Sequence, residues 1–276
     1  MINFIVDAKL CTKCGLCASD CPSRIIEQIG SALPQISTEN ESNCIRCQHC
    51  LAICPTAAIS ILGRKPEDSL PVDAAALPGL DRMERLVRSR RSVRQYKDEN
   101  VPPELIQRLL RTLANVPTGV NRRELSFRVI DDKAVMHSLR EKTMTALAEA
   151  NAAGRIPEHF NYLKDAVPAF REKNIDIIFR GAPHALVVSA PPDAPCPRED
   201  VSLALANFDM LAQSAGLGTV WWGMLTLVLL TVPDLKRFLR LPPEHVYYGM
   251  LFGVPAIRYS RTVQRDDGAR VRRVTG

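Results

Sequence analysis

The sequence is poor in aromatic residues, and several familiar patterns are missing from it. Phenylalanine, tryptophan and tyrosine make up 5% of its 276 residues, and no basic segment is interleaved with them, so we expect no nucleic-acid partner. The longest apolar run, residues 220–232, is too short to cross a bilayer, so we expect no membrane partner either. No G-x-G-x-x-G loop follows an apolar strand, which argues against a Rossmann nicotinamide site.

The start of the sequence does not predict a secretory leader. Residues 1–11 have neither the basic beginning nor the long apolar stretch of such a leader. The nine cysteines suit a reducing interior, because exported proteins tend to oxidise closely spaced thiols. We therefore expect a cytoplasmic protein.

The cysteines form a regular pattern along the sequence. Eight of the nine cysteines form two runs of the same spacing, C-x2-C-x2-C-x3-C-P, with an offset of 33 residues. Bacterial ferredoxins hold two 4Fe-4S clusters with this spacing, and the fourth cysteine of each run binds the other run's cluster. The spacing predicts two sets of metal ligands, which are Cys11, Cys14, Cys17 and Cys54 for the first cluster and Cys44, Cys47, Cys50 and Cys21 for the second.

Four disulfides or two zinc sites would also account for eight cysteines. Disulfides need an oxidising compartment. Zinc sites pair two C-x2-C knuckles, which leaves the trailing C-x3-C-P without a role. The cluster interpretation is therefore favoured. His49 is predicted to be a neighbour of the second cluster, since four thiolates are already available. Cys196 lies in a proline-rich stretch without ligand spacing and is interpreted as a spare loop thiol.

The chain divides at a segment rich in proline, alanine and charge. Residues 1–62 are predicted to form the cluster domain, residues 63–79 a linker, and residues 80–276 a larger domain. Helical spacing predicts helices from residue 80 onward and at 102–114, 132–152, 200–215 and 233–239. Alternating or apolar runs predict strands at 2–6, 33–36, 125–130, 184–190, 219–223 and 246–254, while the apolar stretches 25–29 and 59–62 are expected to pack around the clusters. Strands that alternate with long helices indicate an α+β or α/β domain.

A short basic stretch in the larger domain has the chemistry of an anion site. Arg90–Tyr96 reads RRSVRQY, and in an extended segment Arg90, Ser92 and Arg94 would lie on one side. Guanidinium groups bind phosphate with two parallel hydrogen bonds. A solvated basic run remains the alternative from the residues alone.

RRSVRQY also resembles the opening motif of the FMN-dependent nitroreductase family. Four further stretches follow in the family's order, at residues 117–121 (PTGVN), 181–190, 200–223 and 241–255. The resemblance covers roughly residues 80–265. It implies an α+β fold in which helices flank a mixed sheet, here preceded by a small bacterial ferredoxin-like domain.

The resemblance implies the residues that bind FMN. Arg90, Arg91 and Ser92 would hold the phosphate and ribityl chain, and Arg94 the pyrimidine edge of the flavin. Trp222 and Gly223 would lie near flavin N5 through their backbone, and Arg265 would add a late phosphate contact. Because the family builds its sites across a homodimer, the FMN of the partner subunit would be contacted by Pro117, Thr118, Gly119 and Asn121.

Three parts of the sequence depart from the family, and one of them is residues 260–267 (SRTVQRDD), where the family's basic-proline tail pattern is weakened. Arg122-Arg123-Glu124 stands where many members have Q-P-W, which alters the contacts over the ring edge. Residues 137–180 match no family motif, although this region commonly covers the substrate pocket. Neither a substrate nor a proton donor is predicted from the sequence.

Together the two halves predict an oxidoreductase. Electrons from an external ferredoxin or from NAD(P)H would pass through two 4Fe-4S clusters to FMN, and then to a small organic acceptor such as a nitroaromatic, a quinone or an enone. The alternative is an electron carrier without a dedicated small-molecule substrate, which a closed pocket over the flavin would favour. An iron–sulfur sensor is a weaker alternative, since the sequence shows no nucleic-acid-binding motif.

Overall fold

The computed structural model describes residues 1–265 and 268–275 of the chain. These residues group into two compact units, each of which is described by itself. The first unit is Met1–Pro78 together with Val120–Arg122, and the second is Gly79–Gly119 together with the residues from Arg123 onward.

The first unit is built from two similar halves. Strand β1 (Ile5–Val6) pairs antiparallel with β2 (Ile59–Ser60), and each half has a one-turn helix, α1 (Leu16–Ser19) or α2 (His49–Ala52). The predicted strand at 2–6 is thus confirmed in shorter form, whereas β2 was not predicted as a strand, and 33–36 contributes only the bridge between Glu27 and Gln35. Short 3-10 turns follow at η1 (Thr38–Asn43), η2 (Pro66–Asp68) and η3 (Ala74–Ala76).

The backbone repeats along with the cysteines. Left-handed φ angles occur at Lys13, Gly15 and Arg24, and again 33 residues later at Arg46, Gln48 and Ala57. Such angles cost about 1–2 kcal/mol at a residue other than glycine. They persist where the surroundings leave the chain no alternative. The strained residues lie in the turns that direct the cysteines inward. The backbone conformation of these turns is therefore the most closely fixed part of each half.

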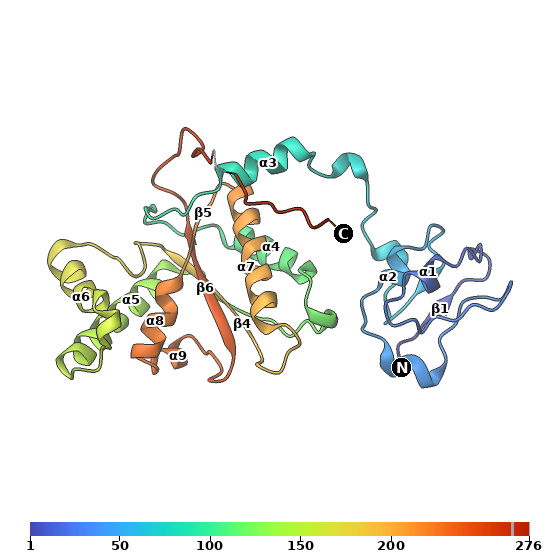
Figure 1. The fold of residues 1–276 in the computed structure, drawn as a ribbon, viewed down its shortest axis with the longest axis horizontal. Coiled ribbons are helices and arrows are strands. Elements are labelled where there is room, and N and C mark those ends of the chain that lie inside the picture. The colour runs from blue at the N-terminus through green and yellow to red at the C-terminus, as the bar shows by residue number, and fades with distance from the viewer. Residues whose placement is uncertain (266–267, 276) are drawn as a thin grey trace. The chain divides into compact units, whose positions relative to one another are not determined.

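The second unit is a sheet covered by helices on both faces (Figure 1). The strand order is β3-β4-β6-β5, and every neighbouring pair is antiparallel. The strands are β3 (Ser126–Ile130), β4 (His184–Ala190), β5 (Gly218–Trp221) and β6 (Val246–Gly253). The helices are α3 (Leu80–Ser89), α4 (Pro103–Thr112), α5 (Lys133–Ala152), α6 (Tyr162–Lys173), α7 (Pro197–Ser214), α8 (Gly223–Thr231) and α9 (Leu235–Phe238). The α+β fold class is thereby confirmed.

The central strand β4 separates two hydrophobic cores. Its side chains alternate, so that Ala185 and Val187 pack with α5, α6 and α8, whereas Leu186 and Val188 pack with α4 and α7. Figure 1 shows α5 and α8 on one side of the sheet and α7 on the other. All residues of β4 are buried, as expected for a strand covered on both faces.

Two helices need comment against the sequence. The apolar helix predicted at 200–215 is α7, which packs against the sheet as a core helix, while a subunit interface on it stays a prediction. The strand predicted at 219–223 ends at Trp221, and the apolar run continues as α8. A run that is apolar at nearly every position has no period, so its helical state could not be derived from the pattern.

No helix in the described part of the chain is both long and apolar enough to cross a membrane.

A buried ion pair fixes the loop before β4. Arg140 Nε on α5 donates to Asp176 Oδ2 at 2.8 Å, and the carboxylate also accepts the amides of Phe179 at 2.7 Å and Gly181 at 3.0 Å. The side chains of Arg140 and Asp176 are 13% and 11% exposed. Loss of one partner of a buried pair typically costs about 3–5 kcal/mol, because the other charge is left unpaired.

We expect Asp176→Ala to lower the free energy of unfolding by about 3 kcal/mol. Urea unfolding followed by tryptophan fluorescence would measure it, because both tryptophans, Trp221 and Trp222, lie in the second unit. The control is Asp193→Ala at an exposed loop position, which should change the unfolding free energy by less than about 0.5 kcal/mol. Equal effects of the two substitutions would contradict the assignment.

A buried histidine makes the stability of the second unit depend on pH. His184 is 0% exposed, and its Nε2 accepts the Val101 amide at 2.9 Å. Burial lowers the pKa of His184, and the nearby Ile130 carbonyl and Asp131 and Asp132 carboxylates offset only part of this shift. Below about pH 6.5 the unfolded chain takes up a proton that the folded chain refuses, so stability falls as the pH falls.

We therefore expect His184→Gln, which keeps an acceptor for Val101, to show a flatter decline in stability between about pH 7 and pH 5.5 than the wild type. Urea midpoints from tryptophan fluorescence at several pH values give both curves. Parallel curves for the two proteins would show that His184 does not contribute.

Candidate functional site

The predicted cysteine ligands line two separate cavities in the first unit. A cavity of about 310 Å³ is lined by Cys11, Cys14, Cys17 and Cys54. A second cavity of about 350 Å³ is lined by Cys21, Cys44, Cys47 and Cys50. The fourth cysteine of each run thus lies with three from the other run, which is the grouping that the spacing predicts. We call them the first and the second cysteine cavity.

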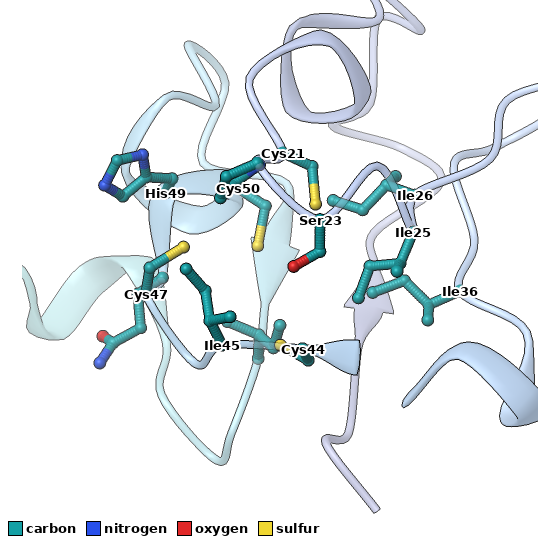
Figure 2. A pocket seen from close by; sticks show the side chains of 13 residues that line it. Cys21, Ser23, Ile25, Ile26, Ile36, Cys44, Ile45, Cys47, His49 and Cys50 are labelled. Carbon is teal, nitrogen blue, oxygen red and sulfur yellow. The ribbon is translucent and has the colours of Figure 1, made fainter. Parts of the chain in front are cut away.

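Figure 2 shows the second cysteine cavity. The sulfur atoms of Cys21, Cys47 and Cys50 point toward a common space, and Ile45 enters it from the opposite side. The ring of His49 points away from that space, and its Nδ1 lies 3.2 Å from Asp20 Oδ2. His49 is therefore placed as a neighbour of this cavity, as predicted.

The cysteines differ in how readily they lose a proton. Burial raises the pKa of Cys50 to about 12 and also raises that of Cys17. The Leu16 amide, followed by the Thr12 hydroxyl, lowers the pKa of Cys14 below its ordinary value despite some burial. A metal that binds the buried thiols must displace their protons, so metal binding and folding are coupled here.

The cysteine cavities fit a group larger than one metal ion. All nine cysteines are free thiols, so the disulfide alternative is not realised. Among the described residues, no three histidine, cysteine or acidic side chains lie close enough to hold a single ion. Four thiols around each cavity offer the donor set that a 4Fe-4S cluster requires.

The arginine-rich segment is held in the second unit by the sheet. Ser92 forms a parallel bridge with Thr219 on β5, where the Val93 amide donates to the Thr219 carbonyl at 2.8 Å. Tyr96 is bridged to Pro255, just after β6. An added Cβ on Gly218 would lie 2.8 Å from the Val93 side chain, so this close approach requires glycine. The segment is therefore fixed at the edge of β5.

Three of the predicted phosphate-binding arginines line one cavity. Its lining consists of Val87, Arg88, Arg90, Arg91, Thr262, Val263, Gln264 and Arg265, around about 1070 Å³ of space that is open to solvent. All of its charged side chains are arginines. We call it the arginine cavity. The sequence separates Arg91 and Arg265 by more than half of the chain, and the structure brings them together.

Arg91, which lines the arginine cavity, has one buried nitrogen without a partner in the described part of the chain. Nη1 and Nη2 of Arg91 donate to the carbonyls of Arg90 at 2.5 Å and Arg88 at 2.7 Å. Its Nε is buried and has no hydrogen-bond partner among the described residues. An orphaned donor beside other arginines fits a phosphate group. Arg94 and Ser92 are not part of this lining, and Arg94 Nη1 instead donates to the Ser92 carbonyl at 3.2 Å.

Two buried aspartates of α7 bind the two segments that are predicted to contact flavin, Arg90–Tyr96 and residues 117–121. Asp209 accepts Arg90 Nη1 at 3.5 Å and Trp221 Nε1 at 3.3 Å, and it also accepts the Thr219 hydroxyl. Asp200 accepts the Gly119 amide at 2.9 Å. Sequence reasoning missed both aspartates, although a carboxylate within an otherwise apolar helix signals a buried partner.

The other residues of the stretch 117–121, which is predicted to contact the FMN of a partner subunit, have separate surroundings. Pro117 is exposed, and the Thr118 hydroxyl accepts the Arg123 amide at 3.0 Å. Gly119 packs against Cys196, whose side chain would lie 3.1 Å from an added Cβ. Cys196 is therefore a packing residue of this loop, beside the start of α7. Asn121 groups with the first unit, where its amide donates to the Ile45 carbonyl at 2.8 Å.

Trp222 and Gly223 lie at the start of α8. The Trp222 indole is 2% exposed, donates to the Ile178 carbonyl at 3.0 Å and packs on Phe179. Its side chain thus belongs to the core, which leaves only the backbone for a ligand. An added Cβ on Gly223 would lie 2.9 Å from the Tyr248 hydroxyl, so a side chain does not fit there without movement.

Two family profiles match the chain. The 4Fe-4S dicluster domain matches residues 3–66. The nitroreductase family matches residues 87–254, which is more than half of the chain. The family match and the sheet between two helical layers place the chain in a class of flavin-dependent oxidoreductases. The chain belongs to the nitroreductase family and has a 4Fe-4S dicluster domain at its N-terminal end.

Individual proteins and structures agree with this. An iodotyrosine deiodinase from Thermotoga neapolitana is 28% identical over 138 residues, which are 49% of this chain and 70% of that protein. A nitroreductase with bound FMN from Bacteroides fragilis has a TM-score of 0.54 at 21% identity, over 68% of this chain and 98% of that chain. Another with bound FMN, from Desulfitobacterium hafniense DCB-2, has a TM-score of 0.54 at 20% identity, over 69% and 97%.

The predicted family, the fold class and the enzyme class are therefore confirmed. The ligand roles of individual residues remain predictions and are taken up next.

Proposed function

We propose that this protein is an electron-transferring oxidoreductase with two 4Fe-4S clusters and FMN, which reduces a small organic acceptor such as a nitroaromatic, a quinone or an enone. The observation that carries the proposal is the joint occurrence, in one chain, of two four-cysteine cavities and the arginine cavity. When bound, the clusters supply one-electron transfer, and FMN joins one-electron to two-electron chemistry.

The cysteine cavities have the residues to hold the clusters. Cys11, Cys14, Cys17 and Cys54 bind the first cluster, and Cys21, Cys44, Cys47 and Cys50 bind the second. The surrounding core is small, so bound clusters also stabilise the first unit. Thiol ligands stay reduced in a cytoplasmic environment, which is where we place the protein.

The arginine cavity has the residues to hold the flavin phosphate. Arg90, Arg91 and Arg265 bind the phosphate, and Ser92 binds the ribityl chain near it. Asp209 keeps Arg90 in place, because its carboxylate is 5% exposed and pairs with that guanidinium. Arg94 would stabilise negative charge on the pyrimidine side of a bound flavin, and Trp222 and Gly223 would lie near its N5 through their backbone.

Pro117, Thr118, Gly119 and Asn121 serve the FMN of a partner subunit in a homodimer. This part of the proposal rests on the family resemblance of the loop. The Asp200 carboxylate, which holds the Gly119 amide, fixes the loop on α7. The electron donor is a reduced ferredoxin or NAD(P)H.

The test is an anaerobic reconstitution of the full chain with iron, sulfide and FMN. The flavin absorbance is then recorded while reduced ferredoxin, NADH or NADPH is added in turn, followed by a nitroaromatic or a quinone. Bleaching by a donor and recovery with the acceptor over many turnovers supports the proposal. Bleaching without turnover of any acceptor would favour an electron carrier, and failure to retain FMN or iron would overturn the proposal.

A further inference from the structure

We propose that the two clusters differ in reduction potential, with the cluster of the first cysteine cavity higher than that of the second. This inference rests on the proposed function, because it requires both clusters. The two halves of the first unit can be compared position by position, because residues 33 positions apart occupy equivalent places in them.

The two cysteine cavities have different walls at equivalent positions. Thr12 lines the first cavity, and its equivalent Ile45 lines the second. The first cavity has two aliphatic side chains besides Pro34 in its lining, Leu16 and Ile59. The second is lined by the isoleucines Ile25, Ile26, Ile36, Ile45 and Ile61. An added electron is less well stabilised among apolar side chains than beside a hydroxyl group, so the second wall lowers the potential of its cluster.

The sulfur atoms also differ in their hydrogen bonds. The Ala58 amide donates to Cys54 Sγ at 3.2 Å in the first cavity. Within the described residues, the equivalent Ile25 amide makes no such bond to Cys21. The Thr56 hydroxyl lies 3.8 Å from Cys54 Sγ in the first cavity, and within the described residues the equivalent Ser23 hydroxyl makes no such contact with Cys21. A donor to a ligand sulfur stabilises the more negative, reduced state and raises the potential.

Charge and exposure act in the same direction. Lys13 lines the first cavity, whereas its equivalent Arg46 is not part of the lining of the second. Cys14 is exposed, whereas its equivalent Cys47 is half-buried and therefore less accessible to water. His49 lines the second cavity, but its ring lies against the Asp20 carboxylate, which offsets a positive charge there. A nearby cation and water both favour the added electron in the first cavity.

The experiment is a mediated redox titration of the reconstituted full-length protein, followed by electron paramagnetic resonance. One electron from the reduced mediator is added at each cluster. We expect two separate one-electron steps of equal amplitude for the iron–sulfur signal. A single step that accounts for both clusters would overturn the inference.

A reciprocal exchange assigns each step to a cavity. Thr12→Ile should shift the higher step downward and leave the lower one in place, and Ile45→Thr should shift the lower step upward and leave the higher one in place. Opposite assignments would overturn the inference. If either exchange prevents cluster assembly, Lys13→Gln and Arg46→Gln are compared instead. Lys13→Gln should lower the potential of the higher step. Arg46→Gln should lower the potential of either step by less than that.

Iron and sulfide analysis separates this inference from the proposed function. About eight irons per chain are required for two 4Fe-4S clusters. A wild-type protein that assembles only about half of this amount refutes the two-cluster function itself. Full iron content with coincident potentials refutes only the inequality of the clusters.

Discussion

Alanine at Cys50 is expected to remove at least one cluster and to stop reduction of the flavin by ferredoxin. Cys50 lies in the second cysteine cavity and is 7% exposed, packed in the small core of the first unit. Loss of a residue that only orients a metal ligand already costs about 10–100-fold in metal affinity, so loss of a ligand should cost at least about 100-fold. Iron and sulfide in the reconstituted protein should fall by about half or more.

The control for this experiment is Cys196→Ala. Cys196 lies outside both cysteine cavities and packs against Gly119 in the second unit, so its removal should leave iron, sulfide and the ferredoxin-dependent rate unchanged. The FMN content of the Cys50 variant should also stay near that of the wild type, because the arginine cavity belongs to the second unit. An unchanged iron content in the Cys50 variant would contradict the ligand assignment.

Alanine at Arg91 is expected to weaken FMN binding by about 10–150-fold. A hydrogen bond to a charged group is worth about 1.5–3 kcal/mol, and each 1.4 kcal/mol is a factor of about ten in affinity. The buried Nε of Arg91 is the donor that has no partner within the described chain, while its two other nitrogens are bonded to backbone carbonyls. The guanidinium is thus held in one orientation with a donor left for the phosphate.

Riboflavin, which lacks the phosphate, gives the matched comparison. Fluorescence titration should show that Arg91→Ala weakens FMN binding but changes riboflavin binding little. Arg91→Lys should fall between wild type and alanine, because it keeps the charge but loses the planar fork. An equal loss for FMN and riboflavin would mean that Arg91 acts on the ring or on the fold rather than on the phosphate.

The two aspartates of α7 show how one helix couples the candidate flavin loops. Asp209 holds Arg90 and the β5 residues Thr219 and Trp221, and Asp200 holds Gly119. Both residues are buried, Asp209 at 3% and Asp200 at 4% exposure. Buried charges persist in proteins where they are paired and hydrogen-bonded. The helix thus serves both as the core of the second unit and as the support for the arginine segment and the Gly119 loop.

The sequence by itself determined what depends on local spacing. The repeated cysteine runs defined two ligand sets, because a cluster needs thiols at fixed separations along the chain. The amphipathic or apolar periods defined β4 and α5 to within a residue, since burial on one or both faces leaves a direct trace in the pattern. The residue types of the arginine segment suggested an anion site but left a solvated basic run open, and the family resemblance was needed to favour a phosphate.

Only the tertiary structure decided what depends on packing between distant segments. It placed Arg265 and Arg91 in the lining of one cavity and left the Arg91 Nε without a hydrogen-bond partner among the described residues. It also showed that the apolar run after Trp221 forms the helix α8. It also assigned Asp200 and Asp209 their partners, which lie far away or on another element. The physical reason is that spacing along a chain fixes periodicity and local ligand geometry, whereas the burial of a charge and the meeting of two loops are set by how elements pack in three dimensions.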